Sequence, residues 1–98
     1  MTRRSQMEIL IDILKVVADG NEKPTHIMYR ANLSWTRLKE QLDFLMKQEM
    51  LVEIEGEEGT IYKLTLKGKE VLEYFRKIEA YLTNSKHAIP TEVYASYR

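Results

Sequence analysis

The segment from residues 51 to 66 most constrains the fold, because it has the pattern of a single β-hairpin. Apolar and polar side chains alternate from Leu51 to Glu55 and again from Thr60 to Leu66. The apolar members share one face of each strand: Val52 and Ile54, then Tyr62 and Leu64. Gly56-Glu57-Glu58-Gly59 between them has the composition of a hairpin turn. The sequence therefore predicts one two-stranded antiparallel element.

A helix is expected before Gly20, which can supply the left-handed residue that ends it. Ser5-Gln6-Met7-Glu8 has the form of a capping box, in which side chains satisfy two backbone amides at a helix start. One apolar face follows at helical spacing: Ile9, Leu10, Ile13, Leu14 and Val17. Met7 and Ile11 fall off this stripe, where they could face a second chain or solvent.

Two further helices are predicted around a short turn at Asn32-Leu33. Thr25 is expected to cap the first of them, which runs to Ala31 after a turn at residues 21–24. Ser34 is expected to cap the second, which runs to Gln48. Its apolar side is expected to face the core: Trp35, Leu38, Leu42, Leu45 and Met46. Two such helices form a helix-turn-helix, and a hairpin directly after it is typical of a winged helix.

A last helix is predicted from Leu66 to Leu82, with Thr65 as its cap. Spacings of four, three and four residues give it a heptad seam: Val71, Phe75, Ile78 and Leu82. Tyr74 and Tyr81 widen that stripe. The fold class is therefore mainly α (α+β), a winged helix-turn-helix with a long C-terminal helix.

Composition narrows the classes of function. The 98 residues allow one domain with a modest core, and the formal net charge is zero. Balanced charge argues against a histone-like coat on DNA, since lysine and arginine supply most non-specific affinity. There is no cysteine, and no apolar run could span a bilayer, so a cytoplasmic protein without membrane contact is expected.

No catalytic chemistry is predicted. His26 and His87 are far apart in the sequence and have neither a nucleophile arrangement nor metal-ligand spacing. The glycines suit helix ends and turns rather than a phosphate-binding loop. We therefore expect no enzyme, no metal, no cofactor and no small-molecule ligand.

The order of elements resembles the archaeal winged-helix proteins of the 10-kDa nucleoid-associated class a, over residues 5–82. The stretch Ile27-Met28-Tyr29 with Ala31-Asn32-Leu33-Ser34 is the most specific match. Two other stretches also match that class. The first lies in the first helix, at residues 8–10 and 13–14, and the second opens the last helix, at Leu64-Thr65, Lys67-Gly68 and Leu72. The resemblance implies a homodimer on double-stranded DNA, joined by an antiparallel coiled coil of the last helices. Two departures are a shorter last helix and a longer, acidic wing.

On this interpretation, residues 5–66 form the DNA-binding domain, residues 67–83 the dimerisation helix and residues 84–98 an irregular or disordered tail. Helix 34–48 is the expected recognition helix of a transcription regulator or nucleoid-associated protein. Arg37 is the first candidate for base reading, because a guanidinium can engage guanine O6 and N7 together. The full set expected at DNA is His26, Arg30, Ser34, Thr36, Arg37, Glu40, Gln41, Lys47 and Lys63.

Alternatives remain open at several places. Arg37, Lys39 and Lys47 could be solvated charges, and Phe44 could pack under the wing or touch thymine methyl groups. The wing carries several glutamates and one lysine, Lys63, so it either stays off phosphate or binds a protein. A protein–protein module without DNA contact is thus the alternative function.

The end of the last helix is expected to pair with a second copy. Its apolar residues lie beyond the reach of a compact winged-helix body, and twofold pairing would bury them. The predicted dimer interface consists of Phe75, Ile78, Tyr81 and Leu82.

Overall fold

The computed structural model of the chain describes residues 4–83, so the tail predicted at 84–98 lies outside the described residues. Four helices and one two-stranded sheet follow in the predicted order. They are α1 (Gln6–Ala18), α2 (Pro24–Ala31), α3 (Trp35–Lys47), β1 (Leu51–Gly56), β2 (Gly59–Leu64) and α4 (Leu66–Thr83). The mainly α winged helix-turn-helix is confirmed.

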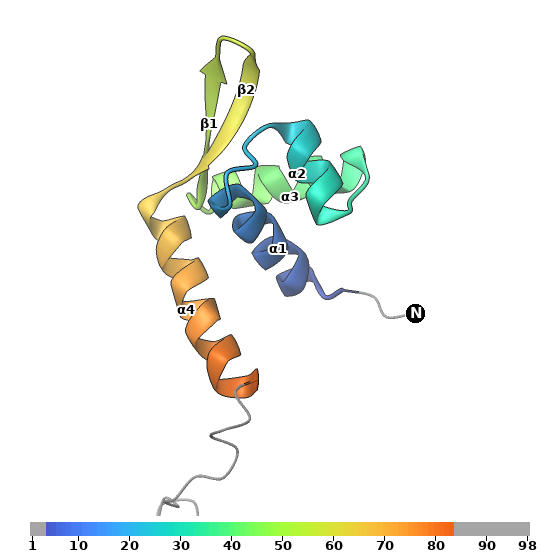
Figure 1. Cartoon of the computed structure of the whole chain (residues 1–98). Helices are drawn as coiled ribbons and strands as arrows, with labels where there is room; N and C mark the ends of the chain where they lie inside the picture. The colour runs from blue at the N-terminus through green and yellow to red at the C-terminus, as the bar shows by residue number, and fades with distance from the viewer. Residues whose placement is uncertain (1–3, 84–98) are drawn as a thin grey trace, which may run out of the picture.

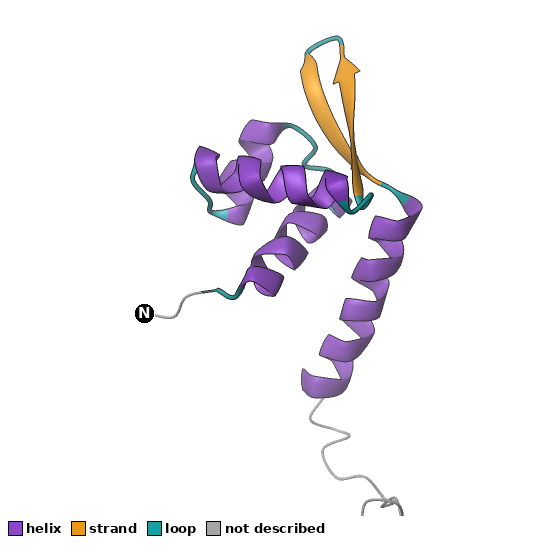
Figure 2. Ribbon diagram, turned by 180° about the vertical axis from the view of Figure 1, so that it is seen from behind, coloured by secondary structure: helices purple, strands orange, loops and turns teal. Residues whose placement is uncertain are grey.

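The first three helices form the body from which the wing and α4 project in opposite directions (Figure 1). Figure 2, from behind, shows α3 crossing in front of α1. The core between these elements is apolar: Ile9, Ile11, Ile13, Leu14, Val17, Ile27, Ala31, Leu38, Leu42, Leu45, Leu51, Tyr62 and Leu72. Ile11 was expected off the core stripe, but it is buried, because α4 packs along that side of α1.

Local caps explain where the helices begin. Ser5 and Glu8 form the predicted capping box, with Glu8 N donating to Ser5 Oγ at 3.1 Å and Ser5 N to Glu8 Oε1 at 2.7 Å. The prediction for Thr25 is wrong: α2 begins at Pro24 with Lys23 as its N-cap and no side-chain cap. Proline suits a first helical position, since its φ is already helical and its missing N–H needs no partner.

The wing is an antiparallel hairpin in which Glu53 pairs with Tyr62 and Ile54 with Ile61. β2 ends at Leu64, two residues before the predicted Leu66, because Leu66 already begins α4. Leu51 and Tyr62 are buried, and the opposite face of the hairpin carries the exposed Val52 and Ile54. Tyr62 N donates to Glu22 O at 2.9 Å and ties the wing to the α1–α2 loop.

A junction at Gly68 joins the end of α3, the wing and α4. Thr65 N donates to Met50 O at 3.1 Å, and Thr65 Oγ1 donates to Glu49 O at 2.6 Å. Gly68 N in turn donates to Thr65 Oγ1 at 3.0 Å, which caps α4 as predicted. A Cβ added at Gly68 would collide with the carbonyl oxygen of Met50, so the close approach of α4 to this turn requires glycine.

Replacing Gly68 by alanine is therefore expected to lower the free energy of unfolding by about 1–3 kcal/mol, the usual cost of overpacking. Alanine alone would favour a helix by about 1 kcal/mol, but a backbone carbonyl cannot move aside as a flexible side chain can. Urea denaturation measures the effect. The neighbouring exposed Lys69→Ala is the control and should stay within about 0.5 kcal/mol of the wild type. An unchanged stability for Gly68→Ala would contradict the close approach.

Candidate nucleic-acid interface

The turn between α2 and α3 fixes the start of the expected recognition helix. Asn32 adopts the left-handed conformation at φ 57°, and Leu33 N donates to Met28 O at 3.1 Å. Ser34 then caps α3 as predicted, its Oγ accepting from Arg37 N at 3.2 Å. The first intrahelical bond is that of Leu38 N to Ser34 O, and Ser34 Oγ takes the Arg37 amide, so the amides of Trp35 and Thr36 are left for an outside acceptor.

The residues expected at DNA occupy three elements. Those on α3 that are exposed are Thr36, Arg37, Glu40 and Lys47, with Ser34 at its start. His26 and Arg30 are exposed on α2, and Lys63 is exposed on β2. Gln41 does not belong with them: it is 6% exposed, and its Oε1 accepts from Gln6 Nε2 at 2.7 Å. The start of α1 covers this side of α3, which the sequence pattern of α3 alone could not show.

Arg37 and Arg4 line one hollow of about 380 Å³ beside the start of α3. Arg4 Nη1 contacts Asp12 Oδ2 at 2.8 Å, and Arg4 Nη2 donates to Asn32 O at 3.0 Å. Arg4 therefore braces the helix-turn-helix, while Arg37 has no carboxylate partner within residues 4–83. The first turn of α3 also contains no acidic residue. The N-terminal half of α3 is thus the part best suited to an anion.

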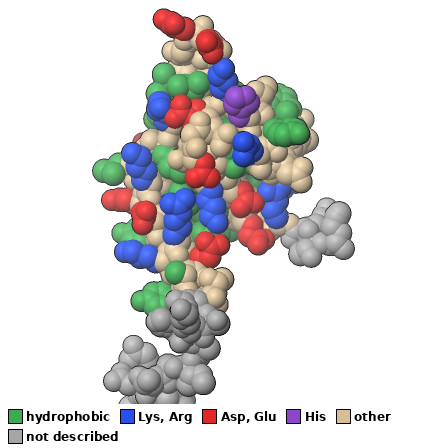
Figure 3. Space-filling model, viewed as in Figure 1, with side chains coloured by type: hydrophobic (Ala, Val, Ile, Leu, Met, Phe, Trp, Pro, Cys, Tyr) green, Lys and Arg blue, Asp and Glu red, His purple; other side chains and the backbone are tan. Residues whose placement is uncertain are grey.

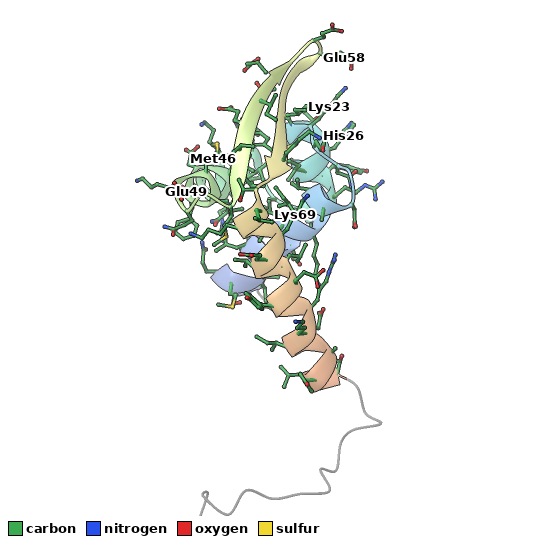
Figure 4. All side chains as sticks on the ribbon, turned by 90° about the vertical axis from the view of Figure 1, so that its left-hand side faces the viewer. Lys23, His26, Met46, Glu49, Glu58 and Lys69 are labelled. Atoms are coloured by element: carbon green, nitrogen blue, oxygen red, sulfur yellow. The ribbon has the colours of Figure 1, made fainter. Side chains whose placement is uncertain are left out.

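The lysine on the wing and the lysine beside it are both paired with carboxylates. Lys63 Nζ lies 2.7 Å from Glu22 Oε2, and Lys23 Nζ lies 3.0 Å from Glu58 Oε1. In Figure 4, Lys23 and His26 lie below Glu58 at the wing tip, on the side of the α1–α2 loop. The two lysines nearest the wing are therefore already neutralised by carboxylates of the same chain.

Acidic side chains also surround the wing's buried tyrosine. Burial, above all, raises the pKa of Tyr62 to about 12, and the carboxylates of Glu53, Asp43 and Glu55 add to the shift. Tyr62 Oη donates to Glu53 Oε2 at 3.2 Å. Glu53 and Glu55 lie on the same face of the hairpin as Tyr62, so this face of the wing is negative. Figure 3 shows acidic side chains at the wing tip and mixed charges over the body. The wing as it stands would repel phosphate.

Trp35 departs from the sequence expectation. Its spacing to Leu38, Leu42 and Leu45 predicted a core residue, but its side chain is 49% exposed. At 100° per residue it lies roughly 60° from the centre of the buried stripe, at its edge. Phe44 is also exposed, at 41%, so neither aromatic ring is sealed inside the body.

A second surface lies between α1 and α4. An apolar hollow of about 300 Å³ is lined by Met7, Leu10, Ile11, Leu14, Leu45, Met50, Val71, Tyr74, Phe75 and Ile78. Lys15 stabilises its α4 wall, with Nζ 5.2 Å from the centroid of the Phe75 ring and 3.5 Å from Glu79 Oε2. Beyond the hollow, in the last turn of α4, Tyr81 and Leu82 are 83% and 80% exposed. Phe75 is thus partly used by the body, while Ile78 and the last turn are free.

Other kinds of site have no support in the described part of the chain. Residues 4–83 contain no group of three ligating side chains that could hold a metal. None of their helices combines the length and apolar character needed to cross a bilayer.

Comparisons with known proteins agree with this architecture. The winged helix-turn-helix family model matches residues 3–83. Sso10a-2, a DNA-binding protein from Sulfolobus solfataricus, is 30% identical with a TM-score of 0.64 over 87% of this chain and 92% of that chain. The transcriptional regulator BldR of the same organism has a TM-score of 0.70 at 18% identity, over 87% of this chain and 63% of that chain, which shows the fold alone.

Two uncharacterised proteins of Methanocaldococcus jannaschii are similar in sequence. One is 33% identical over 76 residues, which are 78% of this chain and 34% of that protein. The other is 41% identical over 44 residues, 45% of each chain. This chain therefore spans less than half the length of both curated relatives. The resemblance to archaeal winged-helix proteins is confirmed, and the chain belongs to the winged helix-turn-helix family.

Proposed function

We propose that this protein binds double-stranded DNA as a homodimeric transcription regulator or nucleoid-associated protein of the cytoplasm. α3 enters the major groove, and no catalytic step is involved. The observation that carries the proposal is the capped start of α3, where the exposed Arg37 has no carboxylate partner within residues 4–83. A major groove admits an α-helix, and a guanidinium there can engage guanine O6 and N7 together.

Each remaining polar residue has a role that follows from its position. Ser34, Thr36 and the free amides of the first turn suit a phosphate. Arg30 on α2 and Lys47 at the end of α3 hold the adjacent backbone, and both lack an ion-pair partner within residues 4–83. His26 is proposed to contact phosphate, and Glu40 to accept a hydrogen bond from cytosine N4. Lys63 can reach phosphate only if it leaves its ion pair with Glu22. Gln41 is omitted because it is buried.

The surface between α1 and α4 supports the proposed dimer. An open apolar hollow and an exposed apolar helix end on the same face leave Ile78, Tyr81 and Leu82 in water. Burying a leucine or isoleucine fully is worth about 1.5–3 kcal/mol. A twofold axis would place the end of each α4 against the hollow of the other subunit and bury both. The first turns of α4 stay with their own body through Leu72 and Gly68.

Arg37→Ala is expected to weaken binding to a duplex selected from a randomised pool by about 1–3 kcal/mol per subunit and to relax the sequence preference at one position of each half-site. Lys47→Ala should weaken all duplexes alike and by less. Fluorescence anisotropy of labelled duplexes measures both, and Lys69→Ala on α4 is the control (Figure 4). With about three phosphate contacts per subunit, the slope of log affinity against log salt should be about −5 for the dimer. If no duplex binds, the protein-interaction alternative replaces this proposal.

The protein is expected to gain DNA affinity when Lys23, beside the wing, is released from Glu58 at the wing tip. Glu58→Gln frees Lys23 in each subunit and should make the salt slope of the dimer more negative by about 1.8, the contribution of one phosphate contact per subunit. Glu57→Gln removes the same charge at the neighbouring position of the tip but leaves the Lys23–Glu58 pair intact. It is therefore the matched control. Equal slopes for the two variants would show that Lys23 points away from the DNA.

The double variant Ile78→Glu/Leu82→Glu is expected to sediment as a monomer, because two carboxylates would be buried without partners at the interface. Its DNA affinity should fall, since one of two half-site contacts is lost. Ala80→Glu, on the other side of the same turn, is the control and should remain dimeric. A wild type that sediments as a monomer at tens of micromolar would refute the dimer.

A further inference from the structure

We propose that Trp35 is a DNA-contacting residue that packs its indole ring against the C5 methyl group of a thymine in the major groove. This inference rests on the proposed function and adds a specificity determinant to it. Trp35 is half exposed at the first position of α3, directly after the capping residue Ser34 and before Thr36 and Arg37. Its exposed indole area stands at the end of the helix that is proposed to enter the major groove, where it can contact a base edge.

The helix geometry places Trp35 and Arg37 on different flanks of α3. At 100° per residue, Trp35 shares its flank with Lys39 and Met46, and Met46 lies beside the lower part of β1 in Figure 4. Arg37 lies on the other flank, where it lines the hollow with Arg4. Thr36 stands between the two flanks and faces outward. A groove that receives this end of α3 would therefore meet an indole on the wing side and a guanidinium on the other.

The chemistry of the groove selects the partner of the indole. Base edges in the major groove present hydrogen-bond donors and acceptors, and the thymine methyl is the only apolar group among them. The face of an indole ring offers apolar area and no hydrogen bond, so it is matched by that methyl group. The first turn of α3 contains no acidic residue, and the nearest carboxylates of this helix, Glu40 and Asp43, lie in the following turns.

The apolar contact would also add affinity that the balanced charge of the chain cannot supply. A protein with zero formal net charge has few cations to exchange for counterions, so its electrostatic affinity for DNA is limited. Burial of an aromatic ring against a methyl group is insensitive to salt. Trp35 would then supply a part of the affinity that persists when the salt concentration is raised, and this part depends on thymine.

The single tryptophan makes the test direct. The selected duplex is prepared with thymine and with deoxyuridine, which lacks only the methyl group. Wild-type protein should bind about fourfold more weakly for each half-site in which uracil replaces thymine, the effect of losing one buried methyl group per subunit. Trp35→Ala should bind both duplexes equally, so that the two changes do not add. Binding is followed by anisotropy of the labelled duplex, and the tryptophan emission is recorded in the same titration.

Two variants control for folding and for position. Trp35→Phe keeps an aromatic ring and should retain part of the dependence on thymine, even if Trp35→Ala fails to fold. Phe44→Ala removes a ring of similar exposure from the other flank of α3 and should leave the thymine dependence at the wild-type value.

The outcomes separate this inference from the proposed function. Duplex binding with unchanged tryptophan emission and no preference for thymine would overturn the role of Trp35 while leaving DNA binding intact. Absence of any duplex binding would overturn both. Tighter binding to the single strand than to its duplex, with quenched emission, would show that the ring stacks on unpaired bases. That result would also overturn the assignment to a thymine methyl.

Discussion

The close approach of Gly68 to the backbone of Met50 determines where α4 starts relative to α3 and to the wing. Thr65 bonds both Glu49 and Met50, so one turn connects the end of α3 to the start of α4 through the base of the wing. The start of α4 is therefore placed relative to the end of α3 by backbone contacts and by the short Thr65 side chain. In a dimer joined through α4, this junction would transmit the position of the interface to each α3. The spacing of two recognition helices would then depend on a glycine far from the DNA.

Ion pairing inside the chain explains how a protein of zero net charge can still leave some cations free to meet phosphate. Carboxylates pair with the lysines around the wing, whereas the cations of the helix-turn-helix that remain unpaired within residues 4–83 are Arg30, Arg37 and Lys47. Net charge is a sum over the whole surface, but phosphate responds to the local field within about a Debye length. The acidic wing and the cationic start of α3 thus divide one surface into a repelling and an attracting part.

Local signals in the sequence were sufficient for the order of elements, because caps and turns act within four residues. Ser5, Ser34 and the Gly56–Gly59 turn confirm this. The burial of individual side chains was harder to predict, since it depends on neighbours that are distant in the sequence. α4 buries Ile11, and the start of α1 buries Gln41. Within the candidate site, exposure of Arg37 followed from the pattern. The pairing of Lys63 with Glu22 did not, because 41 residues separate the partners.

The division between α3 and α4 gives a physical reason why dimerisation and DNA binding would depend on each other. Each phosphate contact releases about 0.9 counterion, so a single subunit with a few free cations would hold DNA weakly at physiological salt. Two subunits held at a fixed separation engage the second half-site at a high effective concentration, and the affinity rises without new contacts. The exposed end of α4 would therefore serve DNA binding although it lies at the opposite end of the molecule from the wing (Figure 1). A substitution at Leu82 would then weaken DNA binding without removing any contact to DNA.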